Sequence, residues 1–353
     1  MSTVPDHAVA AASSDASGST EPPQERRSLL SLLGGVLGNQ QVILLGVFLA
    51  MVVFFTSQNS IFLTTNVFAN ILLDWGPVAL LAVGETFVVI SGGIDLSVGA
   101  TLGFSGICAA YVMKDLTSAG NGQTFVLLVG TAVAVLVGVA VGLVNAALIN
   151  YAKLVPFIAT LATLGAAAGL SIVMTGGAPI GQGPPDAILL SINKVGPFSY
   201  PGLAVVAVVI LAGVFLHRSR FGRFTFAIGS NEFAARAAGI NVRRHLTKVY
   251  ALSGLMAGLA GMLLYLRLGS GAPTSGKGGE LEAIAAVVIG GASLAGGVGR
   301  LSGTILGALI LTTVTSGLII IGVDPDWKQV VVAVLIAAAV SAQGLRKGVG
   351  KAS

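Results

Sequence analysis

Charged side chains are scarce in this chain of 353 residues. Asp, Glu, Lys and Arg together make up 9% of it, hydrophobic residues make up 54%, and the mean hydropathy is +0.92. Soluble domains carry about 25% charged residues, so two soluble domains of this total length would lack the charges to cover their surfaces. The composition excludes soluble domains and predicts an all-α, polytopic membrane protein.

Cysteine and histidine are also too few to build a site. Cys108 is the single cysteine, so an internal disulfide is excluded. His7, His217 and His245 lie far apart and show no metal-ligand spacing. We find no Ser–His–acid set, and therefore expect no catalytic residues and no metal. The pI near 9.5 does not indicate nucleic acid here, because basic residues in a membrane protein mark its cytoplasmic side.

One glycine-rich stretch imitates a nucleotide-binding motif. "GAPTSGKG" (271–278) nearly matches the phosphate-binding loop G-x-x-x-x-G-K-[ST]. Its last position is glycine instead of a hydroxyl residue, and an apolar helix precedes it where the motif requires a strand. We expect a flexible external loop here and no bound nucleotide or other cofactor.

Long apolar runs dominate what is present. A membrane-spanning helix needs about 20 residues, and about ten candidates occur, of which two are short or broken (97–113 and 283–296). The ten lie near 41–56, 66–90, 97–113, 124–150, 157–175, 201–217, 245–267, 283–296, 302–322 and 327–342.

The distribution of basic residues predicts the orientation. If the N-terminus is cytoplasmic, 14 of the 19 Lys and Arg residues fall on cytoplasmic segments, which favours an N-in, C-in topology. Residues 1–28 are polar and without periodicity, which is typical of a disordered cytoplasmic tail. Residues 346–353 are predicted to be a basic cytoplasmic tail.

Glycine is abundant, with 49 residues, and much of it is patterned. Pairs four residues apart lie on one helix face and permit close helix crossing. In addition, "VVISGGIDLSVG" (88–99) resembles "VVIGGASLAGG" (287–297) with a one-residue gap, which indicates repeated, discontinuous helices. The pairs are Gly99/Gly103, Gly138/Gly142, Gly165/Gly169, Gly254/Gly258 and Gly303/Gly307.

Two acids fall inside predicted spans. Asp95 follows the helix break at Gly92 and Gly93 and precedes a new helix starting near Ser97. It can cap the free N–H groups of that helix or take part directly in transport, and its position favours the cap. Glu85 is the second acid, and the sequence names no partner for it.

Other polar residues are candidates for a path through the bundle, since polar groups in membrane helices usually face the interior. Each hydroxyl can instead bond back to its own helix. The two outer glutamates can also solvate a loop, contact a partner or stabilise a helix start. The candidates are Ser97, Thr101, Asn145, Thr160, Thr163, Glu280 and Glu282.

The longest polar connection, 217–248, predicts one short helix over 230–240. Ser230 or Asn231 would cap it, and Phe233, Ala237 and Ile240 would share one side. Such a helix can rest on the membrane surface or dock into a cytoplasmic partner. Its many alanines suit a protein groove better than lipid.

Four stretches carry a family resemblance that covers residues 40–345. They are similar to the inner-membrane permeases of bacterial ribose-type sugar ABC importers. The stretches are "GETFVVISGGIDLSVGA" (84–100), "LVPFIATLATLGAAAGL" (154–170), "GRFTFAIGSNEFAARAAGINVRR" (222–244) and "ELEAIAAVVIGGASLAGGVGRLSGTILGALI" (280–310).

The resemblance implies a multi-pass permease of the bacterial inner membrane that moves a monosaccharide by alternating access. It implies four further chains: a second permease chain, identical or similar, two cytoplasmic ATP-binding subunits that bind the ATP, and a periplasmic sugar-binding protein. It favours docking of the segment 218–244 on the ATPases. The residues that match the family's coupling segment are Gly229, Ser230, Asn231, Glu232, Ala234, Ala235, Arg236, Gly239 and Ile240.

Two alternatives stay open at this point. One is an ABC permease of the branched-chain amino-acid type. The other is a secondary transporter driven by protons or sodium, with Asp95 and Glu85 as its coupling acids.

Overall fold

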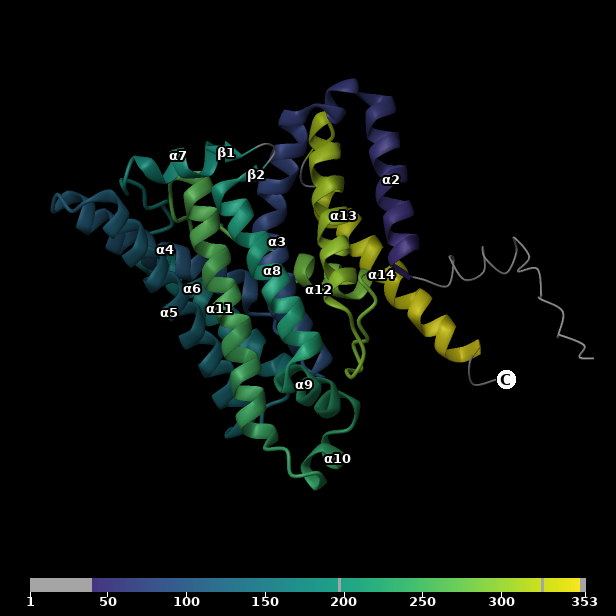
Figure 1. The fold of residues 1–353 in the computed structure, drawn as a ribbon. Coiled ribbons are helices and arrows are strands. Elements are labelled where there is room, and N and C mark those ends of the chain that lie inside the picture. The colour runs from purple at the N-terminus through teal and green to yellow at the C-terminus, as the bar shows by residue number, and fades with distance from the viewer. Residues whose placement is uncertain (1–39, 196–197, 325–326, 350–353) are drawn as a thin grey trace, which may run out of the picture. The chain divides into compact units, whose positions relative to one another are not determined.

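The computed structural model describes residues 40–195, 198–324 and 327–349, which are helical apart from two very short strands (Figure 1). In chain order the elements are α2 (Gln40–Gln58), η1 (Ser60–Leu63), α3 (Thr65–Ile90), α4 (Val98–Ser118), α5 (Gln123–Asn150), α6 (Pro156–Thr175), α7 (Asp186–Ile192), β1 (Lys194–Val195), β2 (Phe198–Ser199), α8 (Tyr200–Arg218), α9 (Arg220–Ser230), α10 (Glu232–Ala237), α11 (Val242–Leu268), α12 (Gly279–Ile289), α13 (Leu301–Ile320) and α14 (Trp327–Val349).

Seven of the described helices are long and apolar enough to cross a membrane: α2, α3, α5, α6, α8, α11 and α13. In α14, a shorter apolar stretch covers Trp327–Ala338. The prediction of an all-α polytopic membrane protein is confirmed, and each of the ten predicted ranges overlaps a helix. The number of crossings and the N-in, C-in orientation remain predictions.

α12 is shorter than the predicted span over 283–296. It has 11 residues and ends at Ile289, because Gly291 adopts φ +92°, a left-handed conformation that stops the helix. Eleven residues rise about 16 Å, roughly half of a 30 Å hydrocarbon layer. The range therefore contains a half-helix followed by a non-helical segment.

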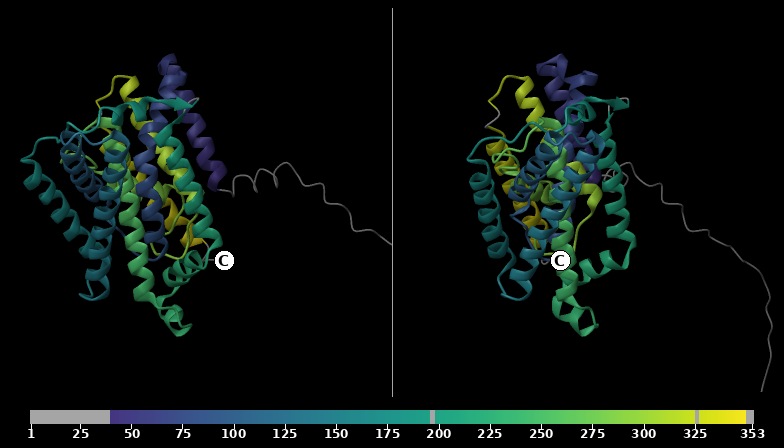
Figure 2. Two further views of the ribbon diagram at one scale, coloured as in Figure 1. Left: turned by 60° about the vertical axis from the view of Figure 1, so that its left-hand side comes forward. Right: turned by 90° about the vertical axis from the view of Figure 1, so that its left-hand side faces the viewer.

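Two helices form the centre of the bundle. In the apolar 18-residue stretch of each helix, 56% of α3 and 61% of α11 is buried, whereas only 11% of α2 and 17% of α8 is buried. α11 packs against α5, α3 and α4, and α13 packs against α3, α12 and α2 (Figures 1 and 2). The core side chains include Phe87 and Ile90 of α3 and Tyr250 of α11, all at most 1% exposed.

Four of the five predicted glycine pairs lie at close backbone contacts. Gly138 and Gly142 of α5 cross Gly254 and Gly258 of α11 so closely that a Cβ atom at Gly138 would lie 2.8 Å from the nitrogen of Gly258. The pair 303/307 packs on α12, and the pair 99/103 packs on residues 275–276. The fifth pair, 165/169 of α6, has no described neighbour within 4 Å outside its own helix backbone.

The two ends of the bundle differ. α9 and α10 lie at one end, and α7 lies at the other with the β1–β2 hairpin, which pairs antiparallel with Lys194 opposite Ser199 (Figures 1 and 2). The predicted tail 1–28 lies outside the described residues. The predicted tail 346–353 begins inside α14, which continues to Val349.

Candidate functional site

The predicted break between α3 and α4 is a non-helical joint of seven residues, 91–97. Gly92 has φ +88°, and the N–H groups of Gly92 and Gly93 donate back to the carbonyls of Val89 and Val88. Gly93 lets Tyr250 of α11 approach, because an added Cβ atom there would lie 3.4 Å from Tyr250 Cζ and would overlap its hydroxyl. Both predicted glycines are thus required by the geometry of the joint.

α12 ends in the same way as α3. The N–H groups of Gly291 and Ala292 donate to Val288 and Val287, which repeats the pattern at Gly92 and Gly93. The internal similarity noted in the sequence therefore corresponds to a repeated helix ending. The structural correspondence needs no gap, since Gly92 matches Gly291 and both have positive φ.

Asp95 is 1% exposed and lies in the middle of a hydrogen-bond cluster. Its Oδ1 accepts from the backbone N–H of Ser97 at 3.0 Å and from the Ser97 hydroxyl at 2.6 Å. Its Oδ2 accepts from the Ser253 hydroxyl of α11 at 2.8 Å, and the Asn145 amide of α5 lies 3.4 Å from Oδ1. One carboxylate thus joins α4, α5 and α11.

The predicted cap is present only in altered form. α4 begins at Val98, and Asp95 accepts the N–H of Ser97, the residue before it. Within the described residues no side chain caps the first turn of α4. Asp95 thus bonds the N-cap residue of α4, and its other oxygen is taken by Ser253 of α11.

The cluster extends to α6 through two predicted threonines. Asn145 donates to the Ser97 hydroxyl at 2.8 Å, and its carbonyl oxygen accepts from the Thr163 hydroxyl. The Thr160 hydroxyl lies 3.2 Å from the carbonyl of Ile94 in the joint. Both threonines also reach carbonyls of their own helix, as the alternative interpretation predicted. Four of the candidates therefore converge on the joint.

Glu85 supplies a second buried acid next to this cluster. It is fully buried in α3, and its Oε1 accepts the backbone N–H of Asp95 at 3.2 Å. Its Oε2 has no hydrogen-bond partner among the described residues. The partner that the sequence left unnamed is therefore the backbone of the joint, and the bond ties α3 to it.

The remaining predicted residues, Glu280, Glu282 and Thr101, have different surroundings. Glu282 forms an ion pair with Lys328 of α14 at 2.7 Å, so it holds two helices together. Glu280 lines a cavity of about 460 Å³ together with Ser171 of α6 and Lys277. We call it the outer cavity. The hydroxyl of Thr101 is buried without a hydrogen-bond partner in the described part of the chain.

The loop 271–278 forms one wall of this cavity. Pro273, Thr274 and Ser275 line it, and Ser275 packs against Gly103 of α4. The loop that was expected to be flexible and external is packed on α4, because the glycines of α4 let the loop backbone approach the helix closely. Small-molecule pockets occupy about 300–1,000 Å³, so the cavity has room for a small polar ligand.

The segment 218–244 contains two helices where one was predicted. α9 ends at Ser230, and Asn231 caps α10 by accepting the N–H of Ala234 at 2.9 Å. The extended backbone of Asn231, with φ −161°, interrupts the helix. The matched residue Gly239 has φ +83° and follows the end of α10, as predicted.

The three residues predicted to share one side of this short helix differ in burial. Phe233 is 82% exposed, whereas Ala235 is 4% exposed and packs with Ile228 and Val242. Ile240 joins that cluster. Glu232 and Arg236 form an exposed ion pair. α10 thus buries an alanine and presents its one aromatic ring outward.

Gly229 places the end of α9 against the end of α3 and the loop that follows α12. A Cβ atom at Gly229 would overlap the carbonyl oxygen of Ile90 and lie 2.6 Å from the nitrogen of Gly297. The N–H of Gly297 in turn donates to the carbonyl of Ile90 at 2.9 Å. Ser230, its neighbour, packs on Gly297.

Residues 67–340 match the family described as branched-chain amino acid transport system / permease component. The chain belongs to this permease family. The matched range contains the joint, the polar cluster, α9 and α10. Together with the seven apolar helices, it makes the chain a multi-pass inner-membrane protein.

Several relatives are sugar import permeases. The ribose import permease protein RbsC of Escherichia coli is 41% identical over 283 residues, 79% of this chain and 86% of that protein. The ribose import permease protein RbsC of Bacillus subtilis is 39% identical over 298 residues, 84% of this chain and 90% of that protein. The D-allose transport system permease protein AlsC of Escherichia coli is 36% identical over 280 residues, 79% of this chain and 84% of that protein. The predicted resemblance to monosaccharide ABC importer permeases is confirmed.

The structure adds two residues that the sequence argument missed. Ser253 and Tyr250 lie on α11, more than 150 positions from Asp95, and nothing in their neighbourhood marks them. A serine inside an apolar run was the only available signal, because buried hydroxyls in membrane helices often bond across helices.

We predict that Asp95→Asn preserves folding and that Asp95→Ala does not. The amide keeps an acceptor for the Ser97 N–H and a donor for Ser253, whose hydroxyl can accept as well as donate. Asp95→Ala leaves several buried donors unpaired and is expected to cost about 3 kcal/mol. Thermal unfolding in a neutral detergent measures both, with Asp115→Ala at an exposed position of α4 as the control. Equal losses in the two Asp95 variants would contradict the prediction.

Proposed function

We propose that this chain is the permease subunit of a binding-protein-dependent ABC importer and forms the path for a monosaccharide. The observation that carries the proposal is the identity of 41% to a ribose import permease across 79% of the chain. ATP is bound and hydrolysed by partner subunits, and this chain contributes no catalytic residue or cofactor. A ribose-like sugar is the proposed cargo.

A sugar is favoured over a branched-chain amino acid, although the family description names the latter. The relatives with the names ribose, allose and galactose/methyl galactoside are 33–41% identical over most of the chain. The outer cavity also fits a hydroxylated ligand, because Ser171, Thr274, Ser275 and Glu280 offer donors and acceptors.

An ion-coupled mechanism through Asp95 and Glu85 has less support. Proton- or ion-binding acids in transporters need to exchange partners with the path. Asp95 is instead held by donors from three segments, and Glu85 holds the backbone of the joint. Both acids therefore serve the interrupted backbone, which must satisfy its polar groups internally.

The proposed cargo and energy source predict a specific uptake pattern. Vesicles that contain the permease, its ATP-binding subunits and the sugar-binding protein are expected to accumulate labelled ribose with ATP and to stop without it. Dissipating the proton and sodium gradients should leave uptake unchanged. Uptake that follows an ion gradient without the ATPase, or that accepts leucine in place of ribose, would contradict the proposal.

α10 is the proposed contact for the ATP-binding subunits. Its one ring, Phe233, is 82% exposed in the described part of the chain, and α9 connects α10 through Gly229 to the end of α3 and the loop after α12. Motion of the docked ATPases would therefore reach the joint at Ile90–Gly93 and the loop at Gly296–Gly297 directly. The nine residues that match the family's coupling segment all lie between the end of α9 and the start of α11.

We predict that Phe233→Ala lowers the affinity for the ATP-binding subunits at least tenfold, about 1.4 kcal/mol. Glu232→Ala with Arg236→Ala should also reduce association and uptake, while changing the stability of the permease by less than about 1 kcal/mol, since exposed ion pairs contribute little. Co-purification and vesicle uptake measure these effects. Phe125→Ala, at a 52% exposed ring on α5, is the control. If all variants retain the ATPases, docking lies elsewhere.

The second permease chain is proposed to pack on α6. Four glycine pairs permit close helix contacts within the chain, whereas Gly165 and Gly169 have no described neighbour within 4 Å outside their own helix backbone. α6 also lines the outer cavity through Ala168 and Ser171. A second chain on this face would cover the open glycines next to the proposed path.

Gly165→Leu with Gly169→Leu is therefore predicted to remove the second permease chain from the assembled importer. The variant chain should still insert and fold, because both positions face open space. Native mass spectrometry of the purified complex counts the permease chains, whether the two are identical or different. Gly46→Leu on α2, also without a described neighbour within 4 Å outside its own helix backbone, is the matched control. A complete complex in the α6 variant would reject this surface.

A further inference from the structure

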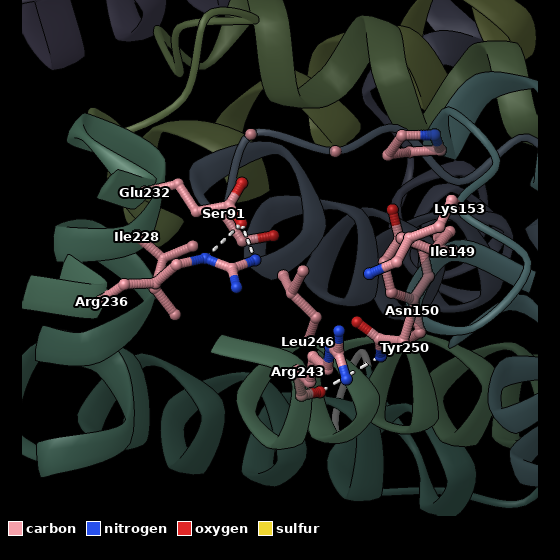
Figure 3. A pocket seen from close by; sticks show the side chains of 13 residues that line it. Ser91, Ile149, Asn150, Lys153, Ile228, Glu232, Arg236, Arg243, Leu246 and Tyr250 are labelled. Carbon is pink, nitrogen blue, oxygen red and sulfur yellow. Dashed lines mark hydrogen bonds and ion pairs between the residues drawn. The ribbon is translucent and has the colours of Figure 1, made fainter. Parts of the chain in front are cut away.

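A second cavity, of about 310 Å³, lies beside α10 at the end of the bundle opposite the hairpin (Figure 3). Four parts of the chain enclose it. They are the joint at Gly92 and Gly93, the connection between α5 and α6, the α9–α10 pair, and the first three turns of α11. It is separate from the outer cavity, with which it shares no residue.

The lining is positively charged. Lys153, Arg236 and Arg243 face a single acid, Glu232, so the net charge is +2. Arg236 is already paired with Glu232, as the dashed lines in Figure 3 show. Lys153 and Arg243 have no carboxylate within ion-pair distance in the part of the chain that the structure describes. Two cations therefore remain available at one small cavity.

The backbone holds these two cations in place. The Asn150 amide donates to the carbonyl oxygen of Arg243 at 3.2 Å and to the Thr247 hydroxyl at 3.1 Å, which fixes the start of α11 to the end of α5. Lys153 has φ +59°, a left-handed conformation that lysine rarely adopts. Strained residues of this kind gather at ligand sites, and here the strain falls on a cavity-lining cation.

Tyr250 gives independent evidence of a ligand. It lines the cavity, is 1% exposed, and its hydroxyl has no hydrogen-bond partner among the described residues. A buried hydroxyl without a partner costs about 1–3 kcal/mol. Since Lys153 and Arg243 are exposed, two exposed cations and one residue with a buried, unpartnered hydroxyl line the same cavity.

We propose that this cavity binds the phosphate group of a small organic phosphate. The guanidinium of Arg243 offers paired donors that match phosphate oxygens, Lys153 adds a point charge, and the Tyr250 hydroxyl donates a further hydrogen bond. The volume admits a pentose phosphate, at the lower end of small-molecule sites. The headgroup of an anionic phospholipid carries the same phosphate chemistry and is the other source.

Occupancy would act on the proposed coupling segment. A bound phosphate touches α10 and α11 on one side and the α3–α4 joint on the other, so it would hold these parts in one arrangement. The site would thus give a phosphorylated ligand control over the permease without entering the outer cavity. Only this consequence rests on the proposed function; binding itself does not.

The test uses the full chain in nanodiscs of phosphatidylcholine, titrated with ribose 5-phosphate by calorimetry and with ribose as the uncharged probe. We expect saturable binding of ribose 5-phosphate that Arg243→Gln and Lys153→Asn each weaken about tenfold. Asparagine suits the left-handed backbone at 153. Arg244→Gln removes the same charge from the next position, outside the cavity, and should change binding less than twofold.

Tyr250→Phe separates binding from folding. Because the hydroxyl has no partner, its removal should leave thermal stability of the empty chain unchanged or raised, while weakening ribose 5-phosphate binding about threefold. If the role of Tyr250 is purely structural, Tyr250→Phe should instead lower the thermal stability and leave ribose 5-phosphate binding unchanged.

A second arm identifies the source of the phosphate. In nanodiscs with phosphatidylglycerol, native mass spectrometry counts the lipids that the chain retains. The site binds a lipid headgroup if Arg243→Gln lowers the number of retained lipids, Arg244→Gln does not, and ribose 5-phosphate does not bind. The proposal is overturned if neither probe distinguishes Arg243→Gln from Arg244→Gln. It is also overturned if Arg243→Gln abolishes only the association with ATP-binding subunits, since the cations then serve a protein contact.

Discussion

The fold depends on a backbone contact between three segments that are distant in the sequence. The end of α3, the end of α9 and the loop after α12 meet at Ile90, Gly229 and Gly297, and the last of these donates to the first at 2.9 Å. The contact exists because no side chain intervenes. A Cβ atom at Gly229 or at Gly296 would overlap the facing backbone or come within about 3 Å of it, a separation that requires something to move.

This contact gives the repeated helix endings a common role. α3 and α12 stop through the same left-handed glycine geometry, and α9 contacts the end of α3 and the loop that follows α12. A membrane helix that stops within the bundle leaves carbonyl groups to satisfy, and each ending does so by folding its own chain back. Because α9 touches both the end of α3 and the loop after α12, a displacement of α9 would act on both segments.

The sequence predicts the parts of the structure that depend on local physics. Hydropathy finds the helices, four of the five glycine pairs mark close backbone contacts, and the Gly92–Gly93 break is placed correctly. The partners of Asp95 are not predictable in this way, because Ser253 lies 158 positions away. The buried side of α10 is not predictable for a related reason. Spacing places Phe233, Ala237 and Ile240 on one side, but the contacts that bury Ala235 come from Ile228 of α9 and Val242 of α11.

The polar cluster takes up the part of α6 between the residues that line the two cavities. Pro156 lines the cavity beside α10, Ser171 lines the outer one, and Thr160 and Thr163 lie between them in the sequence of α6 and belong to the cluster. The proposed path for a sugar would require these bonds to open. Both threonines already have carbonyls of their own helix within 3.0 Å, so each hydroxyl can rotate to its own helix and remain hydrogen-bonded. The cost of opening then falls on Asn145, whose carbonyl oxygen loses its donor, and a hydroxylated cargo is the kind of molecule that can replace that donor.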